Sequence, residues 1–514
     1  ELPNVAVHEL IFGALRANPS HLAMTLATTG ATLTNGQLLD QTLRFAAGLR
    51  ARGFATGDSL ALIAPNCLEY PVGFLAAAAL GGHAALPNPL GTAEEFAGQL
   101  ERTRTKVVVT VAGLLDRVLP AAALAKVATV IVIGEAPSGT TPFSTLLASE
   151  PLTELPVVDP NSLAALPFSS GTSGRPKAVK LTHRNLVANM HQFAIGMPQA
   201  DGHRIIAVLP YFHIYGLVLI LLTSLWRQRP QVVLPRFELD AFLGAIEKHR
   251  VELAPVVPPI MVALAKHPSV DKYDVSSLKF MMTGAAPLGA DIEMAVAARL
   301  KVLVVQGYGM TEVCGASHLL QLDPSTARMG TVGHLVVNMQ ARIIDPATGQ
   351  DARPGERGEV WVRGPNVTSG YLDDDDATAR TITADGWLMS GDIAVVDPDG
   401  YFSVVDRLKE LIKYKAHQVA PADLEAVLLT HPLIADAAVI PSPDDEAGEV
   451  PKAFVVARGT LTADEVMDYV ASKVSPLDKV RRVEFIDSIP KSPSGKILRR
   501  LLVDRERAAR PSNP

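Results

Sequence analysis

Cysteine is nearly absent from this 514-residue chain, which contains only Cys67 and Cys314. Two distant cysteines cannot form a disulfide framework or a cysteine zinc site, and their scarcity suits a reducing compartment. Long apolar runs are also missing, since residues 216–226 fall short of the roughly 18 residues that a membrane-spanning helix needs. The N-terminus lacks a basic segment followed by an apolar one, and the last four residues, PSNP, are not a peroxisomal signal. We therefore expect a cytoplasmic protein without a membrane span.

An excess of positive charge is absent too. The chain has 47 basic and 53 acidic residues, a net charge of -6, and its basic residues are scattered. A nucleic-acid partner is therefore not expected. With 48% hydrophobic and 19% charged residues the composition is that of a globular protein. The length exceeds what one hydrophobic core usually organises, so more than one domain is expected.

The first four hundred residues alternate short β-branched runs with longer helical patterns. Residues 107–111 and 127–133 are typical of buried strands, and residues 34–53 have helical apolar spacing between a capping Thr and a terminating Gly. This alternation predicts an α/β fold with parallel sheets and crossover helices. From about residue 340 short strands punctuated by Gly predict a small antiparallel sheet or barrel, and after Arg407 the pattern predicts a separate α+β unit.

Residues 167–186 read PFSSGTSGRPKAVKLTHRNL and lie between a predicted strand and a predicted helix. Backbone N–H groups, hydroxyls and a lysine in such a loop form the combination that surrounds a phosphate chain. The loop is not a Walker A motif, because Arg175 and Pro176 separate Gly174 from Lys177. From the residues alone, a flexible surface loop remains the alternative.

This loop resembles the signature loop of adenylate-forming enzymes, the superfamily of acyl-CoA synthetases, luciferases and the adenylation domains of peptide synthetases. Six further segments follow in that family's order: LPYFHIYGL (209–217), TGAAPLG (283–289), QGYGMTE (306–312), GWLMSGDI (386–393), VDRLKELIKYKAHQVAPADLE (405–425) and PKSPSGKILRR (490–500). Together they cover nearly the whole chain. The amino-acid sequence of these segments is most similar to that of the branch of 4-coumarate-CoA ligases and luciferases.

The resemblance implies a two-step ligase reaction. ATP and a carboxylic acid form acyl-AMP and pyrophosphate, and CoA then attacks acyl-AMP to give a thioester. It also implies an N-terminal domain over residues 1–405 with a β-rich part at about 340–405, a hinge at 406–409 that includes Lys409, and a mobile C-terminal domain over 410–514.

Site residues follow from the resemblance, position by position. The nucleotide would contact Ser169, Ser170, Gly171, Thr172, Ser173, Gly174, Lys177, Ala286, Gln306, Gly307, Tyr308, Gly309, Thr311, Asp392 and Arg407. Glu312 would hold Mg²⁺, a cation that favours carboxylate and phosphate oxygens. Lys496 would bridge the acid and the α-phosphate, and Thr172 would lie close to that phosphate.

For the second step the resemblance implies Lys413 and Gln418, with His213 gating the acid pocket or the thiol path. The pocket that binds the acid would be lined by Tyr215, Leu219, Lys279, Met282, Ala285, Gly309, Gly315 and Ala316. This mostly apolar set favours cinnamate-like aryl acids or medium-chain fatty acids over amino acids. Two positions depart from the family, because Ala178 and Ala416 replace its usual glycines, and Ala416 is expected to slow thioester formation.

Other interpretations stay open. The enzyme could load a carrier protein, act as a luciferase-type oxygenase, or be a catalytically silent nucleotide-binding relative. Either a monomer or a homodimer is compatible with the sequence. The acidic run at 372–380 is interpreted as favouring the start of a helix rather than binding a metal. Cys314 is interpreted as pocket lining, and the basic tail after Lys496 as a solvated helix face.

Overall fold

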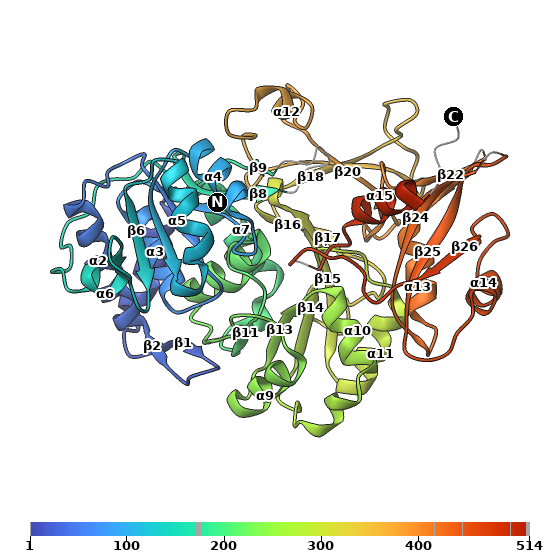
Figure 1. Cartoon of the computed structure of the whole chain (residues 1–514), viewed down its shortest axis with the longest axis horizontal. Coiled ribbons are helices and arrows are strands. Elements are labelled where there is room, and N and C mark those ends of the chain that lie inside the picture. The colour runs from blue at the N-terminus through green and yellow to red at the C-terminus, as the bar shows by residue number, and fades with distance from the viewer. Residues whose placement is uncertain (1, 170–175, 416, 445, 494, 510–514) are drawn as a thin grey trace.

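The computed structural model describes residues 2–169, 176–415, 417–444, 446–493 and 495–509. Within these ranges the strands form sheets of nine, eight, four and five strands. Figure 1 shows the two largest sheets with their helices in the blue-to-yellow part of the chain, the four-stranded sheet above, and the red C-terminal part beside them. The expected α/β class is therefore confirmed.

The first part of the chain supplies all of the eight-stranded sheet and one edge of the nine-stranded sheet. Its elements are α1 (Val7–Ala17), β1 (Leu22–Leu26), β2 (Thr32–Thr34), α2 (Asn35–Ala51), β3 (Ser59–Ile63), α3 (Glu69–Ala79), β4 (His83–Leu86), α4 (Ala93–Arg102), β5 (Thr105–Val111), η1 (Ala112–Leu114), α5 (Leu115–Leu124), β6 (Thr129–Ile133), β7 (Thr141–Pro142), α6 (Phe143–Leu147), β8 (Leu163–Ser169), β9 (Lys177–Ala178) and β10 (Leu181–Thr182). The predicted helix and strands in this region are confirmed. Thr34 Oγ1 accepts a hydrogen bond from the Gln37 N–H and so caps α2.

The middle of the chain completes the nine-stranded sheet. Its elements are α7 (His183–Gly196), η2 (Pro198–Ala200), β11 (Ile205–Ala207), the π-helix η3 (Tyr215–Leu222), α8 (Thr223–Trp226), β12 (Gln231–Val233), α9 (Leu239–His249), β13 (Leu253–Val256), α10 (Pro258–Lys266), η4 (Pro268–Lys272), β14 (Phe280–Thr283), α11 (Ala290–Leu300), β15 (Leu303–Met310), η5 (Thr311–Val313), β16 (Gly315–Leu319) and β17 (His334–Leu335). Strands β13, β14 and β15 are parallel neighbours, so the segments that follow them lie along one sheet edge.

The expected small sheet is antiparallel and open, in the order β18-β19-β20-β21. Its elements are β18 (Gln340–Ile344), β19 (Gly358–Arg363), α12 (Asp375–Ala379), β20 (Leu388–Val396) and β21 (Phe402–Arg407). The acidic run lies at the start of α12, where the Asp374 side chain accepts a hydrogen bond from the Ala377 N–H. That run thus caps a helix, as expected.

The C-terminal part packs helices against a five-stranded sheet among the described residues. Its elements are β22 (Ile412–Tyr414), β23 (His417–Val419), α13 (Pro421–Leu429), β24 (Ile434–Asp444), β25 (Gly448–Ala457), α14 (Ala463–Ala471), β26 (Arg482–Phe485) and α15 (Arg499–Ala509). It has apolar clusters of its own, separate from the large cluster that fills the N-terminal sheets.

The interpretation of the tail as a solvated helix face holds for Arg500, Arg505 and Arg507 of α15, which are exposed, but is wrong for Arg499. Leu502 and Glu506 are buried, and the Arg499 side chain is only 10% exposed. Arg499 forms ion pairs with Glu410 and Glu425, so its guanidinium charge is neutralised inside the protein. The basic residues near the end of the chain suggested solvent exposure. The acidic partners of Arg499, Glu410 and Glu425, lie far from it in the sequence and gave no local signal.

Candidate active site

Three residues expected at the nucleotide meet where β15 faces the four-stranded sheet. Antiparallel pairing of β20 with β21 sets Asp392 opposite Arg407, and Arg407 Nε lies 3.1 Å from Asp392 Oδ1. The Tyr308 hydroxyl donates to Asp392 Oδ2 over 2.7 Å. The Asp392 side chain is 8% exposed, and both its oxygens have partners, so its orientation is fixed.

Gln306 lies in β15 two residues before Tyr308. Its side chain is held by a carboxylate, Glu293, that the sequence did not single out. Gln306 Nε2 donates to Glu293 Oε2 over 2.9 Å and to the Leu288 carbonyl over 3.3 Å. Glu293 Oε2 also accepts the Gly330 N–H over 2.9 Å. Burial raises the pKa of Glu293, whose Oε1 is buried without a hydrogen-bond partner. Helix α11 thus fixes the orientation of the Gln306 amide.

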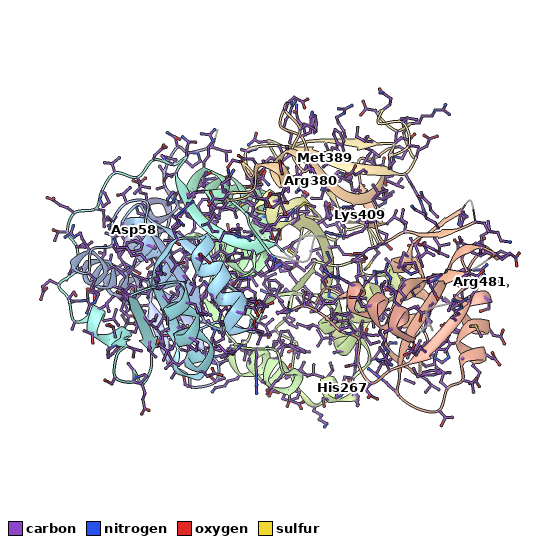
Figure 2. The ribbon with its side chains drawn as sticks, turned by 45° about the horizontal axis from the view of Figure 1, so that its top comes forward. Asp58, His267, Arg380, Met389, Lys409 and Arg481 are labelled. Atoms are coloured by element: carbon purple, nitrogen blue, oxygen red, sulfur yellow. The ribbon has the colours of Figure 1, made fainter. Side chains whose placement is uncertain are left out.

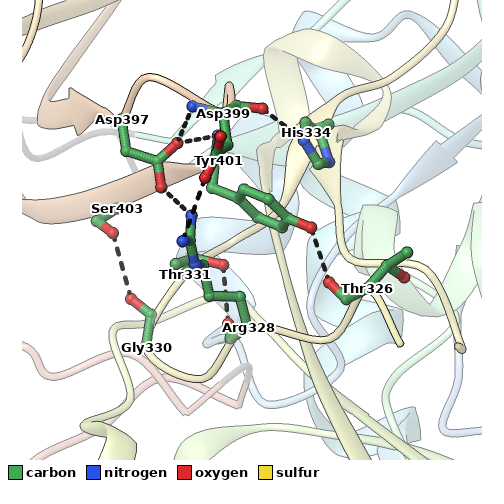
Figure 3. Close-up of polar contacts among 9 residues, drawn as sticks. All are labelled: Thr326, Arg328, Gly330, Thr331, His334, Asp397, Asp399, Tyr401 and Ser403. Atoms are coloured by element: carbon green, nitrogen blue, oxygen red, sulfur yellow. Dashed lines mark hydrogen bonds and ion pairs between the residues drawn. The ribbon is translucent and has the colours of Figure 1, made fainter. Parts of the chain in front are cut away.

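The Gly330 loop is tied in turn to the β20–β21 hairpin, as Figure 3 shows. Arg328 forms ion pairs with Asp397 and Asp399, and its guanidinium lies 4.8 Å from the centre of the Tyr401 ring. The Tyr401 hydroxyl donates to the Thr326 carbonyl over 2.9 Å. The loop therefore joins α11, which holds Gln306, to the hairpin that carries Asp392 and Arg407.

Glu312 and Lys177, expected at the metal and the phosphates, meet at Tyr371. The Tyr371 hydroxyl donates to Glu312 Oε1 over 2.9 Å, and Lys177 Nζ lies 4.7 Å from the centre of the Tyr371 ring. Burial, reinforced by Glu312, raises the pKa of Tyr371, so the phenol stays a donor. The sequence carried no signal for Tyr371, because it lies far along the chain from both partners.

The phosphate loop itself is described only at its two ends. Ser170, Gly171, Thr172, Ser173 and Gly174 lie outside the described residues, as does Ala416. Ser169 closes β8, and its Oγ is buried without a hydrogen-bond partner in the part of the chain that the structure describes. Ala178 lies in β9 and is buried in regular pairing with Phe168, so this departure from glycine fits extended backbone.

Lys496 comes from the C-terminal part and reaches the same site. Burial lowers the pKa of Lys496, and Arg407, Glu410 and Asp392 all act on its charge. A Cβ on the preceding Gly495 would lie 3.0 Å from Val257 and 3.1 Å from Pro259. The loop that carries Lys496 is therefore docked on the N-terminal part, at the start of α10.

A buried charge cluster lies beside the expected hinge. Besides the pairs of Arg499 with Glu410 and Glu425, Asp406 accepts hydrogen bonds from the Arg407 and Ala422 N–H groups. Burial raises the pKa of both Asp406 and Glu425. The expected hinge thus begins at a carboxylate bonded to the first turn of α13. Figure 2 places Lys409 between the small sheet and the C-terminal part.

Lys413 and Gln418 lie opposite each other on β22 and β23, and both are exposed. The Lys413 N–H donates to Glu449 Oε2 over 2.8 Å, which anchors the backbone of β22. The described contacts do not join this pair to Lys496. The two lysines that the sequence analysis assigned to different steps thus occupy separate places in the C-terminal part.

The expected acid pocket is assembled in part. The Tyr215 hydroxyl donates to the Met282 carbonyl over 3.3 Å, and Leu219 is fully buried one turn along η3. Nearby, His213 Nδ1 accepts the Tyr215 N–H, and burial lowers the pKa of His213 to about 4. The imidazole is therefore neutral at pH 7.

Two glycines expected to leave pocket depth also have a packing role. A Cβ on Gly309 would lie 1.7 Å from the Gly315 carbonyl oxygen, and one on Gly315 would lie 2.5 Å from Asn189 Oδ1. Asn189 also bonds to the Ala316 backbone, so this hairpin is closely packed on α7.

Lys279 is not brought to the expected acid pocket. It lies before β14, and its Nζ is 2.7 Å from Glu252 Oε1 at the surface. Ala285, at the other end of β14, is exposed with a φ of 72°.

The remaining expected residues belong to the same sheet edge. Ala286 follows β14, Gly307 lies in β15, and Thr311 begins η5 beside Glu312. Among the described residues, none of the groupings of His, Cys, Asp and Glu could by itself hold a metal ion. Glu312 alone therefore fits a cation only if phosphate oxygens supply further ligands.

None of the described helices has the length and apolar character needed to cross a bilayer.

Comparisons with known proteins agree with this geometry. Residues 12–372 match the model of the AMP-binding enzyme family, and residues 423–496 match that of the AMP-binding enzyme C-terminal domain. The chain is 40% identical to 4-coumarate–CoA ligase 2 of Oryza sativa subsp. japonica, over 97% of this chain and 92% of that protein. It is 42% identical to 4-coumarate–CoA ligase 2 of Petroselinum crispum, over 92% of this chain and 89% of that protein.

Solved structures show the same fold. The anthranilate CoA ligase AuaEII in complex with anthranoyl-AMP matches with a TM-score of 0.94 at 22% identity, over 99% of this chain and 98% of that chain. ATP-bound MatB from Rhodopseudomonas palustris matches with a TM-score of 0.88 at 26% identity, over 98% of this chain and 99% of that chain. The chain therefore belongs to the AMP-binding, adenylate-forming enzymes, and among these it is an AMP-forming acyl-CoA ligase of the 4-coumarate–CoA ligase kind.

Proposed function

We propose that this enzyme joins a cinnamate-like aryl acid, or a medium-chain fatty acid, to CoA by way of acyl-AMP, with Mg²⁺ as its metal. The observation that carries the proposal is the group formed by Tyr308, Asp392 and Arg407, in which Asp392 and Arg407 also act on the charge of the buried Lys496 from the C-terminal domain. The cysteine-poor composition supports a cytoplasmic site of action.

In the first step the acid attacks the α-phosphorus of ATP, and pyrophosphate leaves. Two anions approach each other, so positive charge must be in place before the reaction begins. Lys496 supplies it between the carboxylate and the α-phosphate, and Lys177 supplies it at the outer phosphates. The buried Ser169 Oγ, which has no partner among the described residues, is suited to donate to a phosphate oxygen.

Glu312 is the carboxylate that would hold Mg²⁺, which would neutralise charge on the phosphates. Asp392 is suited to accept hydrogen bonds from the ribose hydroxyls, with Arg407 paired to one of its oxygens. Tyr308 offers its ring to adenine, while Gln306 and Ala286 frame the base. Each of these roles uses the group that the local contacts leave oriented towards one site.

In the second step the C-terminal domain would turn about Lys409 and present Lys413 and Gln418 to the site. Such alternation is a hinge motion in which few linker residues absorb the backbone change. His213, neutral at pH 7 because burial lowers its pKa, is suited to gate the acid or the thiol without adding charge. CoA is the acceptor that we propose.

The proposed acid class follows from the apolar lining. Leu219 is buried in η3, and Met282, Ala285 and Ala316 add hydrocarbon rather than a carboxylate that would bind an amino acid's ammonium group. The names of the relatives, 4-coumarate–CoA ligases among them, support aryl acids.

The proposal is tested with a panel of aryl, fatty and amino acids, each incubated with ATP, Mg²⁺ and CoA and analysed by mass spectrometry. We expect acyl-CoA and AMP from cinnamate-like or medium-chain acids, and pyrophosphate exchange that requires the acid. Acyl-AMP without acyl-CoA, turned over only by a carrier protein, would contradict CoA as acceptor. No exchange with any acid would leave a silent nucleotide-binding protein instead.

A further inference from the structure

Lys266 joins the two domains through three backbone carbonyls. It is the last residue of α10 in the N-terminal domain, and its Nζ lies 2.5 Å from the Leu429 carbonyl oxygen, 3.0 Å from that of Ile434 and 3.3 Å from that of His431. These carbonyls belong to the C-terminal domain. In Figure 1, α10 lies beside α13, and in Figure 2 His267, the residue after Lys266, lies beside the C-terminal domain.

The three carbonyls are suited to a cation. Leu429 ends α13, and the last carbonyls of a helix have no partner within the helix and carry its partial negative charge. An ammonium group has three donors, one for each carbonyl. Burial lowers the pKa of Lys266, so these contacts replace water around the amine. Lys266 therefore acts as a cap that α13 receives from another domain.

The end of α10 is itself held in place. Arg299 donates to the carbonyls of Leu264, Ala265 and His267, which surround Lys266 in the sequence. From the C-terminal domain, Arg458 donates to the Lys266 carbonyl over 3.5 Å. The Lys266 amine is thus presented by a fixed backbone rather than by a loose surface helix.

A second close approach lies on the same side of α13. A Cβ on Gly289, in the N-terminal domain, would lie 2.9 Å from the Ala426 Cβ on α13. Glycine is needed there for the two domains to come this near. The Lys266 contacts and the Gly289 approach both exist in the orientation in which the loop of Lys496 is docked on the N-terminal domain, where a Cβ on Gly495 would lie 3.0 Å from Val257.

We propose that Lys266 is a positioning residue for acyl-AMP formation, because it caps α13 only when the C-terminal domain holds Lys496 in the site. The proposal rests on the proposed two-step function and adds a residue that contacts no substrate. Helix α13 follows the hinge and moves with the C-terminal domain, whereas α10 does not. A rotation about Lys409 that removes Lys496 therefore breaks all three contacts of the Lys266 amine.

The ratio of the two half-reaction rates measures this effect. If the orientations exchange faster than the reactions occur, each rate is proportional to the population of its own orientation. Removing a contact made in only one orientation then changes the ratio by the full change in the equilibrium, whatever the starting populations. A variant that is merely less well folded loses both rates together and leaves the ratio unchanged.

The experiment compares Lys266→Met with wild type. Cinnamate-dependent ATP–pyrophosphate exchange reports the first step, and conversion of preformed cinnamoyl-AMP with CoA reports the second. We expect the ratio of second to first rate to rise at least about tenfold, the effect of losing one charge-assisted hydrogen bond. Lys266→Arg, which keeps a cationic donor, should restore most of the wild-type ratio.

Two further variants complete the design. Lys272→Met removes an exposed lysine from the following segment of the same domain and should leave the ratio unchanged. Gly289→Ala presses on Ala426 and should raise the ratio even if Lys266→Met fails to fold. An unchanged ratio in folded Lys266→Met or Gly289→Ala would overturn the proposal. Failure of wild type to catalyse either step with any acid of the panel would refute the proposed function instead.

Discussion

Tyr371 is a residue whose importance only the folded chain reveals. Its hydroxyl donates to Glu312 Oε1, and its ring lies beneath the Lys177 amine. Because burial raises the pKa of Tyr371, the phenol donates at any physiological pH. One side chain thereby orients the carboxylate expected at the metal and borders the lysine expected at the phosphates.

Glu312→Gln should reduce ATP–pyrophosphate exchange by a factor of order 10², because a preorganised charge at a phosphoryl transfer contributes about that much. Tyr371→Phe keeps the carboxylate but frees its orientation, so a smaller loss is expected, together with a higher Mg²⁺ requirement. Exchange rates measured across a Mg²⁺ titration check both. Glu356→Gln, an exposed carboxylate, serves as the control. Undiminished exchange in Glu312→Gln would remove the metal role.

Glu293→Gln should raise the KM for ATP several-fold with little change in kcat. The native carboxylate accepts from Gln306 and Gly330, and an amide in its place can present a donor that lets the Gln306 amide turn. A loss of this kind is of the size of one buried hydrogen bond, roughly 1 kcal/mol. Steady-state kinetics at varied ATP check it, with Asp291→Asn, exposed on the same helix, as control. An unchanged KM would show that the Gln306 orientation does not affect ATP binding.

At the scale of elements, α1 and α7 are joined through two buried histidines. The Val7 N–H donates to His183 Nδ1, and the His8 and His183 rings lie 6.0 Å apart, edge to face. Burial lowers the pKa of His8 to about 4 and that of His183 to about 3. Both rings are therefore neutral in the folded protein well below the pH at which they gain protons in the unfolded chain.

This pair predicts acid sensitivity. The unfolded chain binds more protons than the folded one between pH 6.5 and about 4, so stability is fully present at pH 7 and falls as the pH is lowered. For His8 alone the loss between pH 7 and pH 5 is about 2 kcal/mol. Urea unfolding at the two pH values should show a smaller loss for His8→Leu than for wild type. His267→Leu, an exposed histidine, should lose as much as wild type, and equal losses in all three would contradict the account.

Elements with local signals were predictable from the sequence. The Thr34 cap and the β-branched run of β5 each depend on neighbouring residues, and the structure confirms both. Arg499 was misjudged because its partners, Glu410 and Glu425, lie many residues away. Short-range chemistry was readable, whereas burial produced by domain packing was not.

At the scale of the whole molecule the site is divided between domains. Motif residues such as Asp392, Arg407 and Lys496 were recognisable because the family pattern marks them one by one. Their supports, Glu293, Arg328 and Tyr371, carry no local pattern and were found only from their contacts. Lys279 shows the opposite error, since position in the pattern suggested a pocket that the fold places elsewhere.

Lys496 and Lys413 occupy separate places in the C-terminal domain. This separation underlies the central claim that one domain serves the two steps in turn. Lys496 is near Asp392 and Arg407, whereas Lys413 lies exposed on β22. If one domain serves two steps in turn, each lysine should matter for one step only. The buried cluster of Asp406, Glu410 and Arg499 lies at the expected hinge, where a few residues would absorb the proposed rotation.

The most direct test measures both half-reactions in Lys496→Ala and Lys413→Ala. Lys496→Ala should lose ATP–pyrophosphate exchange by a factor of order 10² or more, the effect of removing one preorganised charge, yet still convert preformed acyl-AMP and CoA to the thioester. Lys413→Ala should do the reverse and accumulate acyl-AMP. Equal loss of both steps in Lys496→Ala, with circular dichroism showing an intact fold, would contradict the alternation of one domain between two sites.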